Sequence, residues 1–259
     1  MSTILNTGYI WIDLKRNLRQ YVGLFFAVFL PVFMFVIFGT MADFSSNELG
    51  SGRGNVTASI MVNMGAYAAI TATTGLAGSA AVELQQGWGR QIGITPFPTA
   101  GFIASKVVVA LAYSVLAVGA VYVTGLFVGT RMDPWVWPAT FGLLLVGAVT
   151  FALYGLAFGL LFRSEAAVSA ASGLVVVMMF LGNAFMPLTG ILLKLSVFVP
   201  VWGITRLAAY PLDQGETFDA ATGDVIQYEL WQILFNVVAW SIVFAVLCVL
   251  GARRGTGRK

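Results

Sequence analysis

Residues 22–42, with the sequence VGLFFAVFLPVFMFVIFGTMA, contain no charged residue. An apolar run of about 20 residues crosses the hydrocarbon core of a membrane as a helix. Comparable runs lie at residues 58–82, 102–128, 137–162 and 230–251. A weaker run, 166–186, starts with small residues and becomes strongly apolar. We therefore expect an all-α membrane protein with six transmembrane helices.

The composition agrees with this class. Hydrophobic residues make up 59% of the 259 residues, charged residues make up 10%, and the mean hydropathy is +0.88. A soluble domain carries about a quarter charged residues. Residues 1–20 lack both a continuous apolar core and a small-residue cleavage site, so we expect the first run to remain as a span.

The distribution of basic residues predicts the orientation. With the N-terminus inside, ten of the 14 Lys and Arg residues fall in cytoplasmic segments, as the positive-inside rule requires. Both termini are therefore expected in the cytoplasm. The ten are Lys15, Arg16, Arg19, Arg90, Lys106, Arg163, Arg253, Arg254, Arg258 and Lys259.

The pattern changes in residues 183–229, between the fifth and sixth spans. Pro187, Pro200 and Pro211 divide this region into apolar pieces too short to span. Because backbone at membrane depth must satisfy its hydrogen bonds, we expect an external re-entrant helical hairpin. A surface-lying amphipathic loop is the alternative. Residues 213–229 hold five acids and are expected to form a solvated external loop, with a cation site as the alternative.

Several chemistries are excluded by missing residues. The chain has no histidine, which removes serine–histidine and cysteine–histidine catalysis and histidine-ligated metal sites. Cys248 is the only cysteine and lies in an apolar run, as a buried structural thiol would. No Gly-Lys dipeptide exists, so a P-loop is absent. We expect no enzyme activity, no metal site and no nucleic-acid partner. The energy for any transport must come from another chain or from an ion gradient.

Residues 9–21 show helical amphipathicity and predict a helix in the cytoplasmic interface. This helix either orients the first span or docks a cytoplasmic partner. Its apolar positions are Ile10, Trp11, Leu14, Leu18 and Tyr21, and its polar positions are Asp13, Lys15, Arg16, Asn17, Arg19 and Gln20.

Residues 83–98, ELQQGWGRQIGITPFP, join the second and third spans. Their glycines permit sharp turns and their prolines stop a helix, so a structured cytoplasmic loop is expected. The pattern resembles the central signature of ABC-2 type permeases. The matching positions are Glu83, Gly87, Arg90, Thr95, Pro96 and, just inside the third span, Lys106.

Two outer pieces, FMPLTG at 185–190 and VPVWG at 199–203, are also similar to that family's outer hairpin. The likeness covers the whole chain as one domain, residues 1–259, and is closest to small bacterial permeases of drug and antibiotic export. One departure is Leu84, where many relatives have Arg, so Arg90 is the expected basic partner of Glu83.

The resemblance implies a homodimer in the bacterial plasma membrane that binds two copies of a separately encoded ATPase. ATP and Mg would sit on that ATPase, and this chain would bind no cofactor. The 83–98 loop and the N-terminal helix would contact the ATPase. The coupling residues would be Glu83, Gly87, Trp88, Arg90, Thr95, Pro96, Lys15, Arg16 and Arg19.

A substrate pathway is expected where spans one, two and five surround an apolar dimer cavity. The second span is rich in small residues, and Gly125-x-x-x-Gly129 and Gly155-x-x-x-Gly159 are further candidates for close packing. The pathway residues would be Phe29, Phe33, Asn63, Thr71, Thr74, Met186 and Pro187. Lipid-facing aromatics are the alternative for the phenylalanines.

The predicted function is therefore ATP-driven export of a lipophilic substrate such as a drug, an antibiotic or a lipid-like molecule. An ion-driven secondary transporter would also fit six spans, although no titratable group lies at mid-membrane. An intramembrane enzyme acting on lipids, or an immunity or structural membrane protein, would fit the same pattern of spans.

Overall fold

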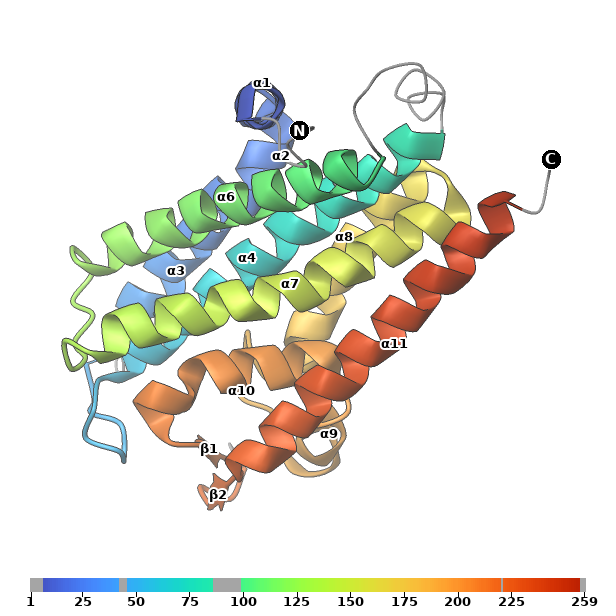
Figure 1. Cartoon of the computed structure of the whole chain (residues 1–259). Coiled ribbons are helices and arrows are strands. Elements are labelled where there is room, and N and C mark those ends of the chain that lie inside the picture. Colours follow the sequence, from blue (N-terminus) through green and yellow to red (C-terminus); the bar gives the residue numbers. More distant parts are fainter. Residues whose placement is uncertain (1–6, 42–45, 86–98, 220, 257–259) are drawn as a thin grey trace.

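The computed structural model describes residues 7–41, 46–85, 99–219 and 221–256 (Figure 1). Its elements are α1 (Thr7–Leu18), α2 (Tyr21–Leu24), the π-helical segment η1 (Phe25–Phe29), α3 (Leu30–Met41), α4 (Val56–Glu83), α6 (Thr99–Gly125), α7 (Val136–Phe162), α8 (Glu165–Leu181), α9 (Gly190–Ser196), α10 (Pro200–Asp213), β1 (Glu216–Phe218), β2 (Val225–Gln227) and α11 (Leu230–Thr256).

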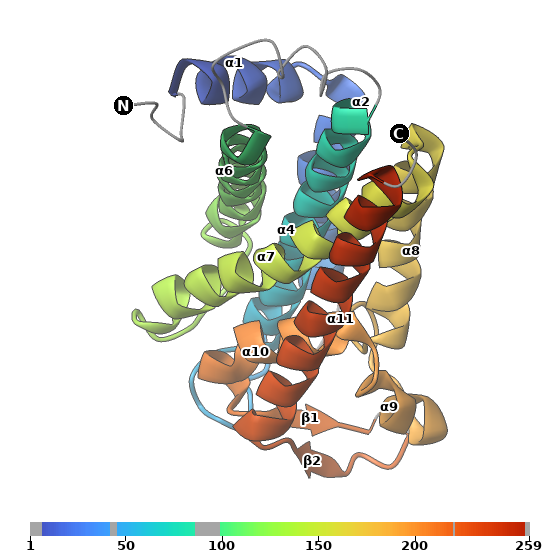
Figure 2. The same cartoon turned by 45° about the vertical axis from the view of Figure 1, so that its right-hand side comes forward.

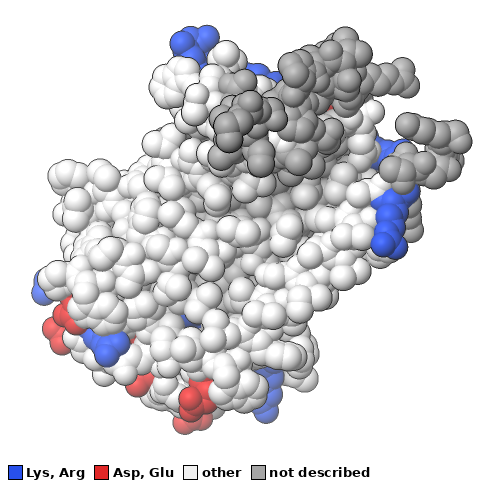
Figure 3. Space-filling view, viewed as in Figure 1, with Lys and Arg blue, Asp and Glu red and all other residues white. Residues whose placement is uncertain are grey.

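The long helices form a bundle with two different ends. At one end α1 lies across the bundle, over the first turn of α6 and close to the last turn of α4, and the last turn of α11 points toward the same end (Figure 2). We call this the terminal end. At the opposite end lie α9, β1 and β2, and we call it the hairpin end. On the face drawn in Figure 3, charged side chains gather toward these two ends and leave a broad uncharged band between them, as a lipid-exposed surface requires.

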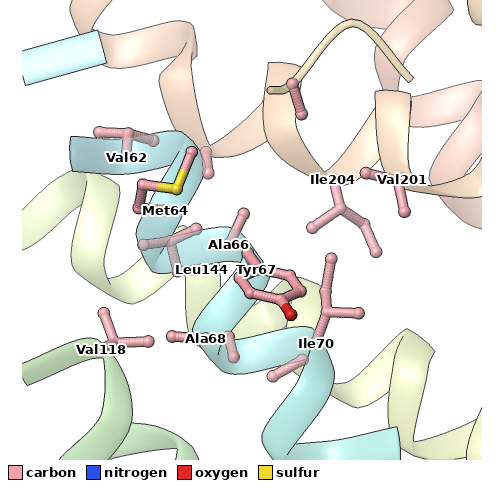
Figure 4. Close-up of a cluster of buried hydrophobic side chains, with 14 of the residues drawn as sticks. Val62, Met64, Ala66, Tyr67, Ala68, Ile70, Val118, Leu144, Val201 and Ile204 are labelled. Carbon is pink, nitrogen blue, oxygen red and sulfur yellow. The ribbon is translucent and has the colours of Figure 1, made fainter. Parts of the chain in front are cut away.

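Helix α4 is the centre of the bundle. It packs against α3, α6, α7, α8 and α10, and most of its residues are buried. Figure 4 shows Val62, Met64 and Ile70 of α4 beside Leu144 of α7 and Ile204 of α10. Because neighbouring helices cover α4 on most sides, a polar face would be buried, and the sequence of α4 is accordingly apolar or small nearly all round.

Glycines allow α4 and α7 to touch backbone to backbone. A Cβ added at Gly155 would collide with the carbonyl oxygen of Thr74, and one at Gly159 would collide with that of Gly78. The Gly155-x-x-x-Gly159 prediction is thus confirmed as a close helix crossing. The Gly125-x-x-x-Gly129 pair does not form such a backbone crossing. Gly125 faces the Met61 side chain, and Gly129 lies after the end of α6 with a φ of +82°.

Within the described residues, five helical segments are long and apolar enough to cross a membrane: Tyr21–Thr40, Val56–Glu83, Ala104–Gly125, Val136–Phe162 and Leu230–Arg253. They correspond to five of the six predicted spans. The remaining one, predicted at 166–186, is the shorter helix α8, which ends at Leu181. Helix α8 reaches from the terminal end to α10, because Glu165 bonds to Ser79 near the end of α4 and Gly182 packs against the backbone of Trp202 in α10.

The first span contains a π-helical turn directly before its proline. Pro31 has no N–H to donate to the preceding turn, and Leu30 N–H bonds to Phe25 O, five residues back. Phe25, Phe26 and Phe29 lie in this turn, and each of the three residues is about half exposed.

The hairpin end corrects two expectations about residues 183–229. Pro211 does not end a helical piece but lies inside α10, which continues to Asp213. The Pro211 carbonyl accepts a hydrogen bond from Arg53 Nη1 (3.2 Å), and Ser51 Oγ donates to Leu212 O (2.6 Å). Two of the last carbonyls of the helix are therefore hydrogen-bonded by side chains of another loop. Residues 213–229 contain an antiparallel pair, β1–β2, rather than only a solvated loop, so the fold is not strictly all-α.

The alternative expected for this region, a surface-lying amphipathic loop, does not fit α10. Helices α9 and α10 meet at 84°, and α10 packs on α7, α11 and α4 rather than lying on the surface. Its Arg206 is buried with Asp213, to which Nη1 donates at 3.2 Å. The same nitrogen reaches Glu216 O at 3.3 Å, and this contact joins α10 to β1.

We predict that Gly155→Ala destabilises the chain by about 1–3 kcal/mol, because the added methyl forces α4 and α7 apart. Thermal unfolding of the purified protein in detergent measures this. Gly142→Ala is the matched control on α7, since a Cβ there meets nothing within 4 Å. Equal unfolding temperatures for the two variants would contradict the close crossing.

Candidate coupling cluster and cavity

Four charged side chains form a closed ring at the terminal end, which we call the charge ring. Arg16 Nη2 of α1 contacts Asp13 Oδ1 at 3.0 Å and Glu83 Oε1 at 2.6 Å. Lys106 Nζ of α6 contacts Asp13 Oδ1 at 2.9 Å and Glu83 Oε2 at 2.8 Å. Negative and positive charges alternate around the ring, so each group has two partners of opposite sign.

The ring is buried unequally. Asp13 is 4% exposed, Lys106 7%, Glu83 21% and Arg16 44%. A charge so far from water is tolerated only when it is paired and hydrogen-bonded. Burial alone would lower the pKa of the Arg16 guanidinium, but its contacts with Glu83 and Asp13 outweigh burial and hold that pKa above its usual value. The guanidinium therefore stays charged within the ring.

The ring fixes how α1 lies on the bundle. Asp13 and Asn17 are the buried residues of α1, whereas Trp11 and Ile12 are exposed. The amphipathic pattern of the sequence assigns Asp13 and Asn17 to the solvent-facing polar side, and this assignment is wrong. The structure turns them toward the bundle because Lys106 on α6 supplies the partner that Asp13 needs.

A cavity of about 600 Å³ lies directly beside the ring. Its walls come from α1, the first span, α4, α6 and the first half of α8, and all four ring residues line it. This volume falls within the range of small-molecule sites. Away from the ring its lining combines apolar side chains such as Phe26 and Val176 with the hydroxyl-bearing Thr71, Ser169 and Ser172.

The predicted coupling residues divide into three groups. Glu83 and Arg16 belong to the charge ring. Lys15 and Arg19 are exposed on and just after α1. Gly87, Trp88, Arg90, Thr95 and Pro96 lie outside the described residues, as does the 83–98 loop beyond Gln85. Within the described residues the partners of Glu83 are Arg16 and Lys106, and the expected partner Arg90 lies outside these residues.

The predicted pathway residues are not brought together. Thr71 lines the cavity. Phe29 and Phe33 stack on each other at 5.9 Å on the half-exposed outer face of the first span. Asn63 and Thr74 are buried inside the bundle, and neither is among the cavity's lining residues. Met186 and Pro187 are exposed beyond the end of α8.

The sequence alone does not assign roles to three residues of the site. Asp13 falls within a pattern typical of a solvated face, and no local feature indicates its partner on another helix. Lys106 stands out only as a position of the family signature. Glu165, whose Oε2 accepts a hydrogen bond from Ser79 Oγ at 2.9 Å, has no local sequence signal.

The fold and the cavity define a multi-pass membrane protein whose cavity has one charged wall. Residues 8–201 match the family model described as ABC-2 type transporter. The chain therefore belongs to the ABC-2 type transporter family and is the membrane component, not the catalytic one, of an ABC-type transporter. No curated protein sequence matches it significantly.

We predict that Lys106→Met destabilises the chain by about 3–5 kcal/mol, because it leaves the buried Asp13 carboxylate with a single exposed partner. The double variant Asp13→Asn, Lys106→Met should lose less than the sum of the two single variants. Detergent unfolding measurements test this, with the exposed Lys15→Met as the control on α1. Additive losses would show that the two side chains do not interact.

Proposed function

We propose that the chain is the permease subunit of an ATP-driven exporter that moves a lipophilic substrate out of the cell. Two copies would form a homodimer in the bacterial plasma membrane, with both termini in the cytoplasm. Two copies of a separately encoded ATPase would carry the ATP and Mg. The observation that carries this proposal is the charge ring, which joins the elements expected to meet the ATPase to the wall of the cavity.

The ring supports the proposal through its connections. Arg16 lies on α1, and Glu83 is the last residue of α4, at the start of the 83–98 loop. Arg16 contacts Asp13, and Glu83 contacts Lys106. All four residues line the cavity. A displacement of α1 or of the loop must therefore move charged groups at the cavity mouth, because paired charges in a poorly hydrated site cannot separate cheaply.

The proposed mechanism is alternating access. Closure of the ATPases on ATP would push α1 and the 83–98 loop, and the ring would pass that displacement to α4 and α6. The cavity would then narrow, and the substrate would leave past Met186 and Pro187 at the hairpin end. The buried α10 would form the outer barrier to that exit, because it fills the bundle between α7 and α11.

The positive-inside distribution supports the cytoplasmic assignment of the terminal end. Arg16, Lys106, Arg163 and Arg253 all belong to segments at that end, where an ATPase would dock. The lipophilic nature of the substrate is supported by the apolar majority of the cavity lining away from the ring.

We predict that an ABC ATPase copurifies with the chain from detergent-solubilised membranes and that the complex hydrolyses ATP. Glu83→Gln and Arg16→Gln should keep the complex but reduce substrate-dependent export at least about tenfold, since a loss of about 1.4 kcal/mol in coupling has that effect. Export from vesicles and ATP hydrolysis are measured together.

Glu229→Gln is the matched control, because Glu229 is an exposed carboxylate at the hairpin end. It should export normally. Normal export by both ring variants would overturn the coupling role of the ring. A folded protein without any ATPase partner would overturn the exporter function and favour ion-driven transport or an immunity role.

A further inference from the structure

The described residues that line the cavity carry an unbalanced negative charge. Its lining contains two cations, Arg16 and Lys106, and three carboxylates, Asp13, Glu83 and Glu165. The charge ring uses both cations and two of the carboxylates, and neutralises itself. Among the described lining residues Glu165 is the remaining charge, so this part of the lining has a net charge of −1.

Glu165 is an exposed residue of the cavity lining and belongs to α8, a different helix from those that carry the ring. It is the first residue of α8, and Ser79 Oγ of α4 donates to its Oε2 at 2.9 Å. Within the described part of the chain, no Lys or Arg nitrogen lies within 4.0 Å of its carboxylate. The helix dipole favours a carboxylate in the first turn of a helix, which accounts for its position on α8 but not for its place on a cavity wall.

The ring carboxylate Asp13 has one oxygen without a hydrogen-bond partner among the described residues. Asp13 is 4% exposed, its Oδ1 receives both ring cations, and its Oδ2 makes no hydrogen bond to any described residue. This oxygen is itself closed off from solvent, so a ligand in the cavity does not reach it. The preference of the cavity for a cation over an anion therefore rests on Glu165.

The rest of the lining suits the body of such a ligand. Phe26 of the first span and Tyr67 and Tyr113 of α4 and α6 face the cavity, and aromatic rings attract cations as well as apolar surface. Ser169 and Ser172 on α8 add hydroxyl groups on the same wall as Glu165.

We propose that this cavity binds an amphipathic organic cation, with its positive group at Glu165 and its apolar body between the first span and α8. That such a cation is exported rests on the proposed permease function. The binding itself does not, because it depends only on the charge and shape of the cavity.

Tetraphenylphosphonium and tetraphenylborate test the proposal, because they share size and shape and differ in the sign of their charge. Binding of each is measured by equilibrium dialysis with the purified full chain in detergent. Glu165→Gln keeps an acceptor for Ser79 and removes only the charge, while Glu229→Gln is the control at the far end. Comparing variants in the same detergent cancels the unequal partition of the two ions into micelles.

We expect Glu165→Gln to weaken phosphonium binding about tenfold, equivalent to about 1.4 kcal/mol, and to leave borate binding unchanged or tighter. Glu229→Gln should change neither. Equal effects on the two ions, or no effect on phosphonium binding, would overturn the proposal. Copurification of an ATPase is measured separately. If an ATPase copurifies but the charge preference is missing, only the cation-binding inference is refuted. If the charge preference is present but no ATPase copurifies, only the exporter function is refuted.

Discussion

Ionised groups in a poorly hydrated bundle must be paired, and this constraint shapes the terminal end of the molecule. Asp13 and Lys106 are almost fully buried, so each depends on the other and on Arg16 and Glu83 for compensation. The pairing places α1 across α4 and α6, and it makes one wall of the cavity polar. Loss of a single member would leave a buried charge without compensation in apolar surroundings.

The remainder of the bundle follows from close packing around α4. Gly78, Gly155 and Gly159 bring α4 and α7 into backbone contact, and this leaves α8 beside α4 while the first span lies on α4 and α6. The cavity occupies the space between the first span and α8. Its charged mouth and its apolar walls thus come from two separate physical causes, one electrostatic and one steric.

The spans were predictable because a membrane requires long apolar runs, and the family signature was visible in the order of short motifs. The continuation of α10 through Pro211 was not predictable from the sequence. The donors that hydrogen-bond to its last carbonyls, Ser51 and Arg53, come from a loop that is distant in the sequence. The inward face of α1 was not predictable either. Helical periodicity reports which residues share a face, and it cannot show that Lys106 on another helix pairs with Asp13.

Amide hydrogen exchange of α1 tests most directly whether the charge ring holds this helix on the bundle. The purified chain and its Lys106→Met variant would be compared in the same detergent. The account predicts that exchange across Thr7–Leu18 speeds up more in the variant than exchange in α10 does, because α10 packs mainly on α7 and α11, away from the ring. Unaltered exchange in α1 would contradict it.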